Sequence, residues 1–150
     1  MSALRWVISL VAGFVITSGL NWVVAEKFLN PLIKPGLDGL MRSGGDTQVG
    51  VLTAGFALIV AVVAVLTAIV RVPVHWLWRG VAVGALVSAA AFFGAYTFLS
   101  GWMYLPTGEM CVTAIADSLT VIVGATVISF IQHFRLDRAP ATGDPSPQSR

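Results

Sequence analysis

The sequence predicts an all-helical membrane protein, a bundle of four transmembrane helices, from three observations. First, the 150-residue chain is 57% hydrophobic and only 11% charged, whereas soluble domains carry roughly 25% charged residues. Second, the apolar residues form unbroken runs rather than the apolar–polar alternation of membrane-spanning strands. Third, four of these runs reach the length of about 20 residues that a helix needs to cross a bilayer. We therefore expect lipid to surround most of the chain.

The four predicted spans follow one another with short connections. They cover about 6–25, 49–70, 76–99 and 110–134 and form one transmembrane domain over 1–135. The outer loop 26–48 is the only sizeable connection. Residues 136–150 are polar and proline-rich, which predicts a disordered cytoplasmic tail. For the first run the alternative is a cleaved signal peptide, but the run is long for a signal, so we expect a retained span.

The positive charges predict the orientation of the spans, since cytoplasmic flanks are enriched in Lys and Arg. If the spans alternate in direction, five arginines fall on one side: Arg5, Arg71, Arg79, Arg135 and Arg138. The opposite side mixes both signs: Glu26, Lys27, Lys34, Asp38, Arg42, Asp46 and Glu109. The arginine side is predicted to face the cytoplasm, and both chain termini lie on it.

Small residues predict the faces through which the helices pack, because in lipid helices associate by close backbone approach and hydrogen bonds. Each predicted span carries such a stripe at three- to four-residue spacing. The stripes are Ser9, Gly13, Thr17 and Asn21; Ala57, Ala61, Ala64 and Ala68; Gly80, Gly84 and Ser88, continuing through Ala91 and Ala95; and Thr113, Asp117, Thr120 and Gly124. We interpret them as packing within the bundle, with contact to another subunit as the alternative.

The strongest candidate for a functional residue is Asp117, an acid inside the fourth predicted span. It lies about 10 Å into that span at about 1.5 Å per residue, where a carboxylate costs up to about 2.5–3.5 kcal/mol. Since no Lys or Arg lies at that depth, the predicted partners are neutral: Thr113, Thr120, Thr17, Asn21 and Thr97, with Ser18, Thr53, Tyr96 and Ser100 at similar depth. Two interpretations remain open, a hydrogen-bond network that fixes packing or a proton or cation site that opens to the outside.

Other kinds of chemistry have little support in the sequence. The net charge of +2, without a cluster of Lys and Arg, argues against nucleic-acid binding. A single cysteine, Cys111, excludes an internal disulfide and a multi-cysteine metal site. His75 and His133 both flank the inner side, where interfacial hydrogen bonding explains them better than a shared metal or haem. We therefore expect no metal, no cofactor and no enzymatic activity.

Two functions are compatible with these features. The first is a non-catalytic accessory or structural subunit that associates with partner membrane proteins through its transmembrane helices, as the small size and the small-residue stripes favour. The second is a small proton- or cation-coupled transporter or channel, a homo-oligomer built around Asp117. Because the chain is compact and its loops are short, we expect a multi-pass protein located in a bacterial inner membrane.

Overall fold

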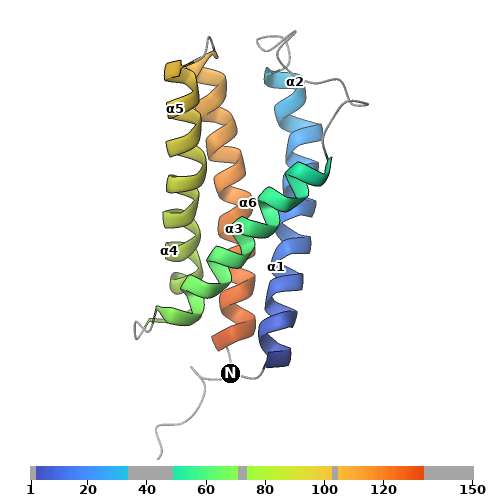
Figure 1. Ribbon diagram of the computed structural model, residues 1–150, viewed down its shortest axis with the longest axis vertical. Helices are drawn as coiled ribbons and strands as arrows, with labels where there is room; N and C mark the ends of the chain where they lie inside the picture. The colour runs from blue at the N-terminus through green and yellow to red at the C-terminus, as the bar shows by residue number, and fades with distance from the viewer. Residues whose placement is uncertain (1–2, 34–48, 71–73, 103–104, 134–150) are drawn as a thin grey trace, which may run out of the picture.

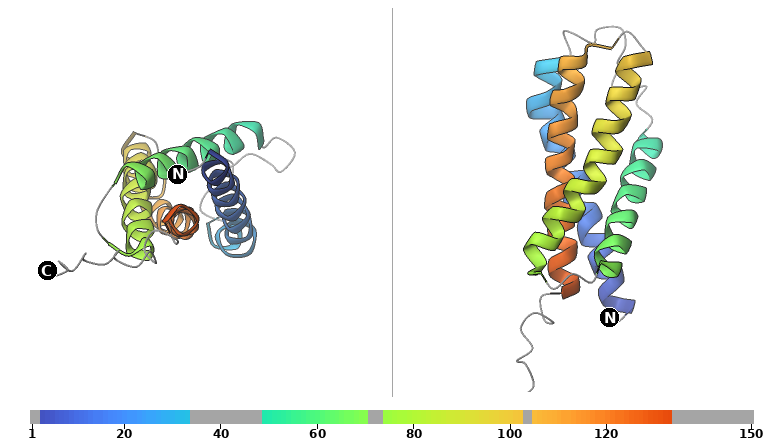
Figure 2. Two further views of the ribbon diagram at one scale, coloured as in Figure 1. Left: turned by 90° about the horizontal axis from the view of Figure 1, so that it is seen from below. Right: turned by 90° about the vertical axis from the view of Figure 1, so that its left-hand side faces the viewer.

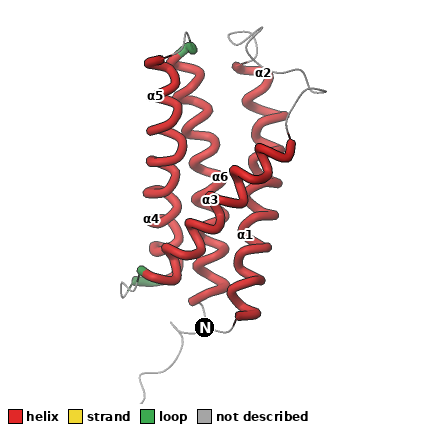
Figure 3. Tube along the Cα trace, in the orientation of Figure 1, coloured by secondary structure: helices red, strands yellow, loops and turns green. Residues whose placement is uncertain are grey.

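The computed structural model describes residues 3–33, 49–70, 74–102 and 105–133, and every regular element in these ranges is a helix (Figure 1). Four segments are long and apolar enough to cross a membrane: Ala3–Leu32, Val49–Ile69, Trp76–Gly101 and Thr107–His133. No strand occurs within the ranges given above (Figure 3). The predicted all-helical fold with four membrane-length helices is thus confirmed. The predicted tail, 136–150, lies outside the described residues.

Two of the four segments contain a wide, π-helical turn. The first consists of α1 (Ala3–Val24), the π-helix η1 (Ala25–Leu29) and α2 (Asn30–Ile33), and the third of α4 (Trp76–Ser88), the π-helix η4 (Ala89–Gly94) and α5 (Ala95–Trp102). The second and fourth are single helices, α3 (Val49–Ile69) and α6 (Thr107–His133). The segments alternate in direction, so α1 starts where α6 ends (Figure 1). We call this the Arg5 end of the bundle and the opposite one the Glu109 end.

The first helical segment extends further than the sequence predicted. The outer loop was expected to begin at residue 26, but the helix continues to Ile33, and residues 34–48 lie outside the described part. Glu26 and Lys27 are exposed on the helix, so charges that mark a membrane boundary do not end the helix itself. The wide turn η1 lies directly before Pro31, whose ring would clash with a carbonyl of a regular turn. A widened turn at that position lets the helix continue past the proline.

Helix α6 forms the centre of the bundle. Half of its most apolar 18-residue stretch is buried, against 17–22% in the other three segments. Viewed along the bundle, α6 lies between α4 and α1, and α3 crosses on a third side (Figure 2). Its sequence suits this place, because Ala114, Gly124 and Ala125 are small enough to let neighbouring backbones approach.

Glycines on α4 allow that helix to touch the backbone of α6. A Cβ atom at Gly80 would lie 2.5 Å from the Cα of Thr126, and one at Gly84 would lie 2.8 Å from the Cα of Ile122. Both glycines are buried. One turn further, the buried Ser88 hydroxyl donates to the Gly84 carbonyl at 2.7 Å and lies 3.4 Å from the Ser118 carbonyl of α6. This stripe of α4 is therefore the contact face with α6.

The contact between α1 and α6 is built in the same way, with a glycine on each helix. A Cβ at Gly13 would lie 2.5 Å from the Ile128 side chain of α6 and 3.5 Å from Val60 of α3. A Cβ at Gly124 would overlap the hydroxyl of the buried Thr17. Each missing side chain leaves room for a side chain of the opposite helix, so neither glycine can be enlarged without moving a neighbour.

The predicted alanine stripe on α3 does not match the buried face. Ala64 is fully buried, but Ala61 and Ala68 are only half-buried and Ala57 is exposed. The buried residues are instead Val60, Val63, Ala64 and Thr67. In a helix of alternating Ala and Val the small-residue pattern fits several faces. Of the buried residues, Val60 faces Gly13 of α1, since a Cβ at Gly13 would lie 3.5 Å from its side chain.

A buried glutamine links three helices near the Arg5 end. The amide nitrogen of Gln132 on α6 lies 3.1 Å from the Ser9 hydroxyl of α1 and 3.4 Å from the Ala64 carbonyl of α3. Close by, the Ser129 hydroxyl of α6 donates to the Trp76 carbonyl of α4 at 2.7 Å. The sequence reasoning singled out neither residue. Ser9, Thr67, Ile128, Ser129 and Gln132 in this half are all fully buried.

The backbone contact at Gly80 predicts a large effect of one methyl group. Gly80→Ala forces α4 away from α6, because the neighbouring atoms belong to the backbone and cannot rotate aside. We expect a loss of about 1–3 kcal/mol in the free energy of unfolding, the usual result of overpacking. The measurement is reversible unfolding by SDS in mixed micelles. Gly19→Ala on α1 is the matched control, since a Cβ there meets nothing within 4 Å. Equal losses in both variants would contradict the close contact.

Candidate functional site

Asp117 is buried and held by two side chains from other helices. It is 7% exposed, on the face of α6 that looks toward α1 and α5. The amide nitrogen of Asn21 on α1 donates to one carboxylate oxygen at 2.6 Å. The phenol hydroxyl of Tyr96 on α5 donates to the other at 2.8 Å. The acid thus joins three helices, and each of its oxygens accepts one hydrogen bond.

The predicted partners of Asp117 divide into those that reach its carboxylate and those that do not. Asn21 reaches it, and so does Tyr96, which the sequence reasoning placed only among residues of similar depth. The Thr120 hydroxyl donates to the backbone carbonyl of Asp117 at 2.8 Å. Thr113 bonds to the Glu109 carbonyl and lines the same cavity as the acid. Thr17 packs against Gly124, and Thr97 is exposed on α5, so neither touches the carboxylate.

The wide turn η4 brings Tyr96 onto the face that meets α6. In a regular α-helix residues four apart drift around the axis by about 40° per step, at 3.6 residues per turn. The sequence therefore predicted that the stripe of α4 continues through Ala91 and Ala95. Instead Ala95 is exposed, and the inward positions are Phe92 and Tyr96, four and eight residues after Ser88. A π-helix has more residues per turn and cancels the drift. The predicted stripe beyond Ser88 was therefore wrong at Ala95, whereas Ala91 is half-buried and packs against the core.

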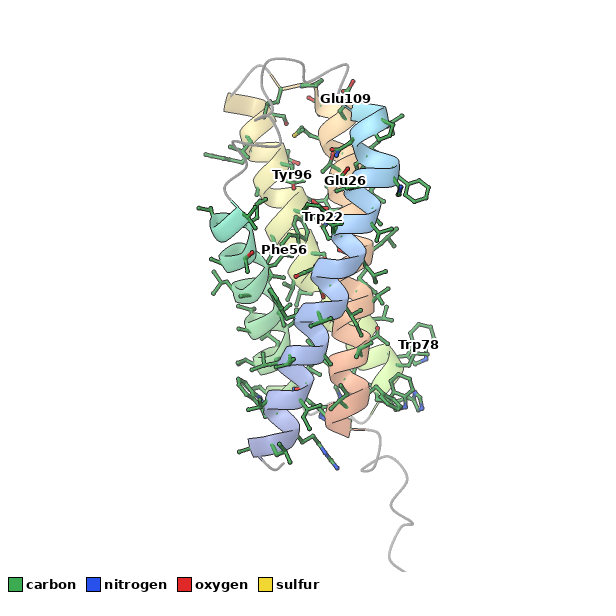
Figure 4. All side chains as sticks on the ribbon, turned by 90° about the vertical axis from the view of Figure 1, so that its right-hand side faces the viewer. Trp22, Glu26, Phe56, Trp78, Tyr96 and Glu109 are labelled. Carbon is green, nitrogen blue, oxygen red and sulfur yellow. The ribbon has the colours of Figure 1, made fainter. Side chains whose placement is uncertain are left out.

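Asp117 lies on the wall of an open cavity of about 430 Å³ in the Glu109 half of the bundle. Five polar side chains share it with a largely apolar lining, to which Tyr96 and Phe56 belong (Figure 4). The full lining is Asn21, Ala25, Leu29, Asn30, Val51, Leu52, Gly55, Phe56, Ile59, Phe92, Tyr96, Thr113 and Asp117. We call this cavity the Asp117 groove. Both π-helical turns border it, and such turns occur frequently at functional sites.

The other residues considered from sequence do not form a site with Asp117. His75 is exposed and caps α4, where its Nδ1 accepts from the Leu77 amide at 3.3 Å. The Nδ1 of His133 lies 3.3 Å from the Ser129 carbonyl. Cys111 is a free, exposed thiol. Within the ranges that the structure describes, no group of three His, Cys, Asp or Glu side chains is placed to hold a metal ion.

Comparison with known proteins gives no family for this chain: no family model, no curated protein and no solved structure matches it significantly. The function therefore has to be argued from the bundle and its groove.

The geometry predicts that Tyr96 and Asp117 are energetically coupled. Tyr96→Phe removes the hydroxyl and keeps the ring, and we expect a loss of about 0.6–1.7 kcal/mol in the free energy of unfolding, as for hydrogen bonds between membrane helices. In an Asp117→Leu background the same change should have almost no effect, because the acceptor is gone. A double-mutant cycle by SDS unfolding measures the difference.

Thr97→Val, one position along the same helix and exposed, is the control for this cycle and should change stability little in either background. Strictly additive effects of Tyr96→Phe and Asp117→Leu would show that the hydrogen bond carries no coupling.

Proposed function

We propose that this protein is a non-catalytic accessory subunit of a membrane assembly, and that a partner's transmembrane helix packs against the outer half of α3. The observation that carries the proposal is the exposure of that half. From Val49 to Leu58 every residue is exposed except the half-buried Phe56. The Glu109 halves of α6 and of the first and third segments each bury at least one residue, such as Leu29, Phe92 and Ala114.

The residue types on this half of α3 support a helix partner. At about 100° per residue, Gly50, Ala54, Ala57 and Ala61 lie on one face. The first three are exposed, and none of the four lines the Asp117 groove. A face that meets only lipid gains nothing from small residues, whereas helix–helix contacts in membranes are enriched in them. By contrast, the stripes with Gly13, Gly80, Gly84 and Gly124 are already used within the bundle.

The transporter alternative is favoured by Asp117 on the wall of an open groove, yet the groove ends within the bundle. Toward the Arg5 end the space between α1, α3 and α6 is filled by Val60, Ala64, Ile128 and Gln132, each at most 3% exposed. Passage of a solute through one chain would require these residues to separate. The groove is therefore better suited to binding than to conduction.

The surface fits a bilayer with the Arg5 end toward the cytoplasm. Trp78 lies near the Arg5 end with 65% of its surface exposed (Figure 4), as expected for the aromatic belt near one interface. Of the arginines that flank the spans, Arg5 and Arg79 are described, and both lie in the Arg5 half of the bundle. A bacterial inner membrane remains the proposed location.

The accessory role predicts a stoichiometric partner that depends on α3. We expect mass measurement of the native complex, extracted gently from its own membrane, to find a second protein in a fixed ratio to this one. Ala57→Leu should release that chain at least tenfold more readily, because a larger side chain separates the two helices. Ala85→Leu, an equally exposed alanine on α4, is the matched control. A homo-oligomer without a foreign chain would overturn the accessory role and favour the transporter.

The proposed orientation predicts one-sided labelling. In a Cys111→Ser background, Thr107→Cys at the Glu109 end should react with a membrane-impermeant maleimide added to intact cells. Ser149→Cys, in the C-terminal tail, should react only after the cells are opened. The opposite pattern would mean that the arginine side faces outward.

A further inference from the structure

Beyond the proposed subunit role, we infer that the Asp117 groove binds a small hydrophobic organic cation, with the Asp117 carboxylate as its counter-charge. The groove lies on the opposite face of α3 from Gly50, Ala54 and Ala57, so this site is separate from the proposed partner surface. The inference stands on the charge, the lining and the size of the groove.

In its ionised form, Asp117 has no opposite charge beside it in the groove. Asp117 is the only charged side chain among the residues that line it. No Lys or Arg of the described ranges pairs with its carboxylate, whose two partners, Asn21 and Tyr96, are neutral. An ionised carboxylate accepts about four hydrogen bonds, so two acceptor positions remain after these two. A group that brings a positive charge would complete the site.

The rest of the groove lining favours a cation that has a large apolar part. Phe56 of α3, Phe92 of η4 and Tyr96 of α5 contribute aromatic rings, and the centroids of Phe92 and Tyr96 are 6.0 Å apart. Aromatic faces attract cations within about 6 Å, most strongly where water is excluded. Leu52 and Ile59 add aliphatic surface. A strongly hydrated inorganic ion would gain little from such walls, whereas an alkylated ammonium would bury its apolar part against them.

The size of the groove suits a small molecule. Its volume of about 430 Å³ falls in the range of about 300–1,000 Å³ usual for small-molecule sites. Gly55 keeps the α3 wall open, since a Cβ there meets nothing within 4 Å.

The test uses the full-length protein in phosphatidylcholine nanodiscs, titrated calorimetrically with benzyltrimethylammonium and corrected for empty nanodiscs. We expect saturable binding at one site per chain. Phenylmethanesulfonate, which has the same benzyl group and a tetrahedral head of opposite charge, should not bind saturably. Asp117→Asn should weaken the binding of the ammonium at least tenfold, because the amide keeps the shape of the carboxylate and removes its charge.

A second variant keeps the test decisive if Asp117→Asn folds poorly. Gly55→Leu leaves Asn21, Tyr96 and Asp117 intact and fills the groove from α3, so it should also weaken binding at least tenfold. Gly50→Leu is its matched control on the same helix, equally open and outside the groove, and should bind as the unmodified protein does.

Non-saturable uptake of the ammonium by the unmodified protein would overturn the inference, as would equal affinity in Gly55→Leu or in folded Asp117→Asn. A partner chain that still co-purifies and depends on Ala57 would in that case leave the accessory role standing. Conversely, saturable ammonium binding by a chain that has no partner would support the groove and reject the subunit role.

Discussion

The arrangement of the bundle depends on how closely two helices approach α6. For a helix surrounded by lipid, attraction comes from close packing and hydrogen bonds, because the lipid tails are as apolar as the side chains. Gly80 and Gly84 let the backbone of α4 touch that of α6, and Gly13 and Gly124 each leave room for a side chain of the opposite helix where α1 meets α6. These two contacts hold α6 at the centre between two neighbours. They also decide that the polar side of α6, with Asp117, faces inward.

The position of α3 follows from these contacts. With both flanks of α6 occupied, α3 packs across the third side and crosses the other helices at an angle (Figure 1). It touches the bundle through Val60, Val63, Ala64 and Thr67 in its Arg5 half and departs from it toward Val49. The departure opens the Asp117 groove on one face of α3. On the opposite face it leaves a row of small residues exposed. Both proposals for this protein therefore arise from one geometric feature, the tilt of α3 away from the glycine-packed core.

The sequence predicted the parts of the structure that follow from composition and from strong local patterns. Four membrane-length helices follow from the length of the apolar runs. Gly13, Gly80, Gly84 and Gly124 could be identified because a small residue at regular spacing has little reason to occur on a lipid-facing side. Asn21 could be named among the candidate partners of Asp117 because it lies at a similar depth in the first predicted span.

What the sequence could not predict depends on departures from regular helix geometry and on tertiary choice. Tyr96 reaches Asp117 because of the wide turn η4, and no residue of Ala89–Gly94 indicates in the sequence that the number of residues per turn changes there. The continuation of the first segment through Pro31 needed η1 in the same way. On α3, Ala61 fitted the pattern as well as Val60 did, and only the tertiary packing buries Val60 and leaves Ala61 half-buried. Gln132 was overlooked because a polar residue near the end of a span is usually interfacial.

The energetics of Asp117 explain why the fold tolerates the acid without a bound ligand. A carboxylate near the bilayer centre costs about 2.5–3.5 kcal/mol, and less toward an interface. Each interhelical hydrogen bond returns about 0.6 kcal/mol on average and up to about 1.7 kcal/mol, so the bonds from Asn21 and Tyr96 together offset a large part of that cost. They do not neutralise the charge, however, since both donors are neutral. The same residue can thus be stable in the empty bundle and still attract a cation into the groove, because hydrogen bonding and charge neutralisation are separate contributions to its free energy.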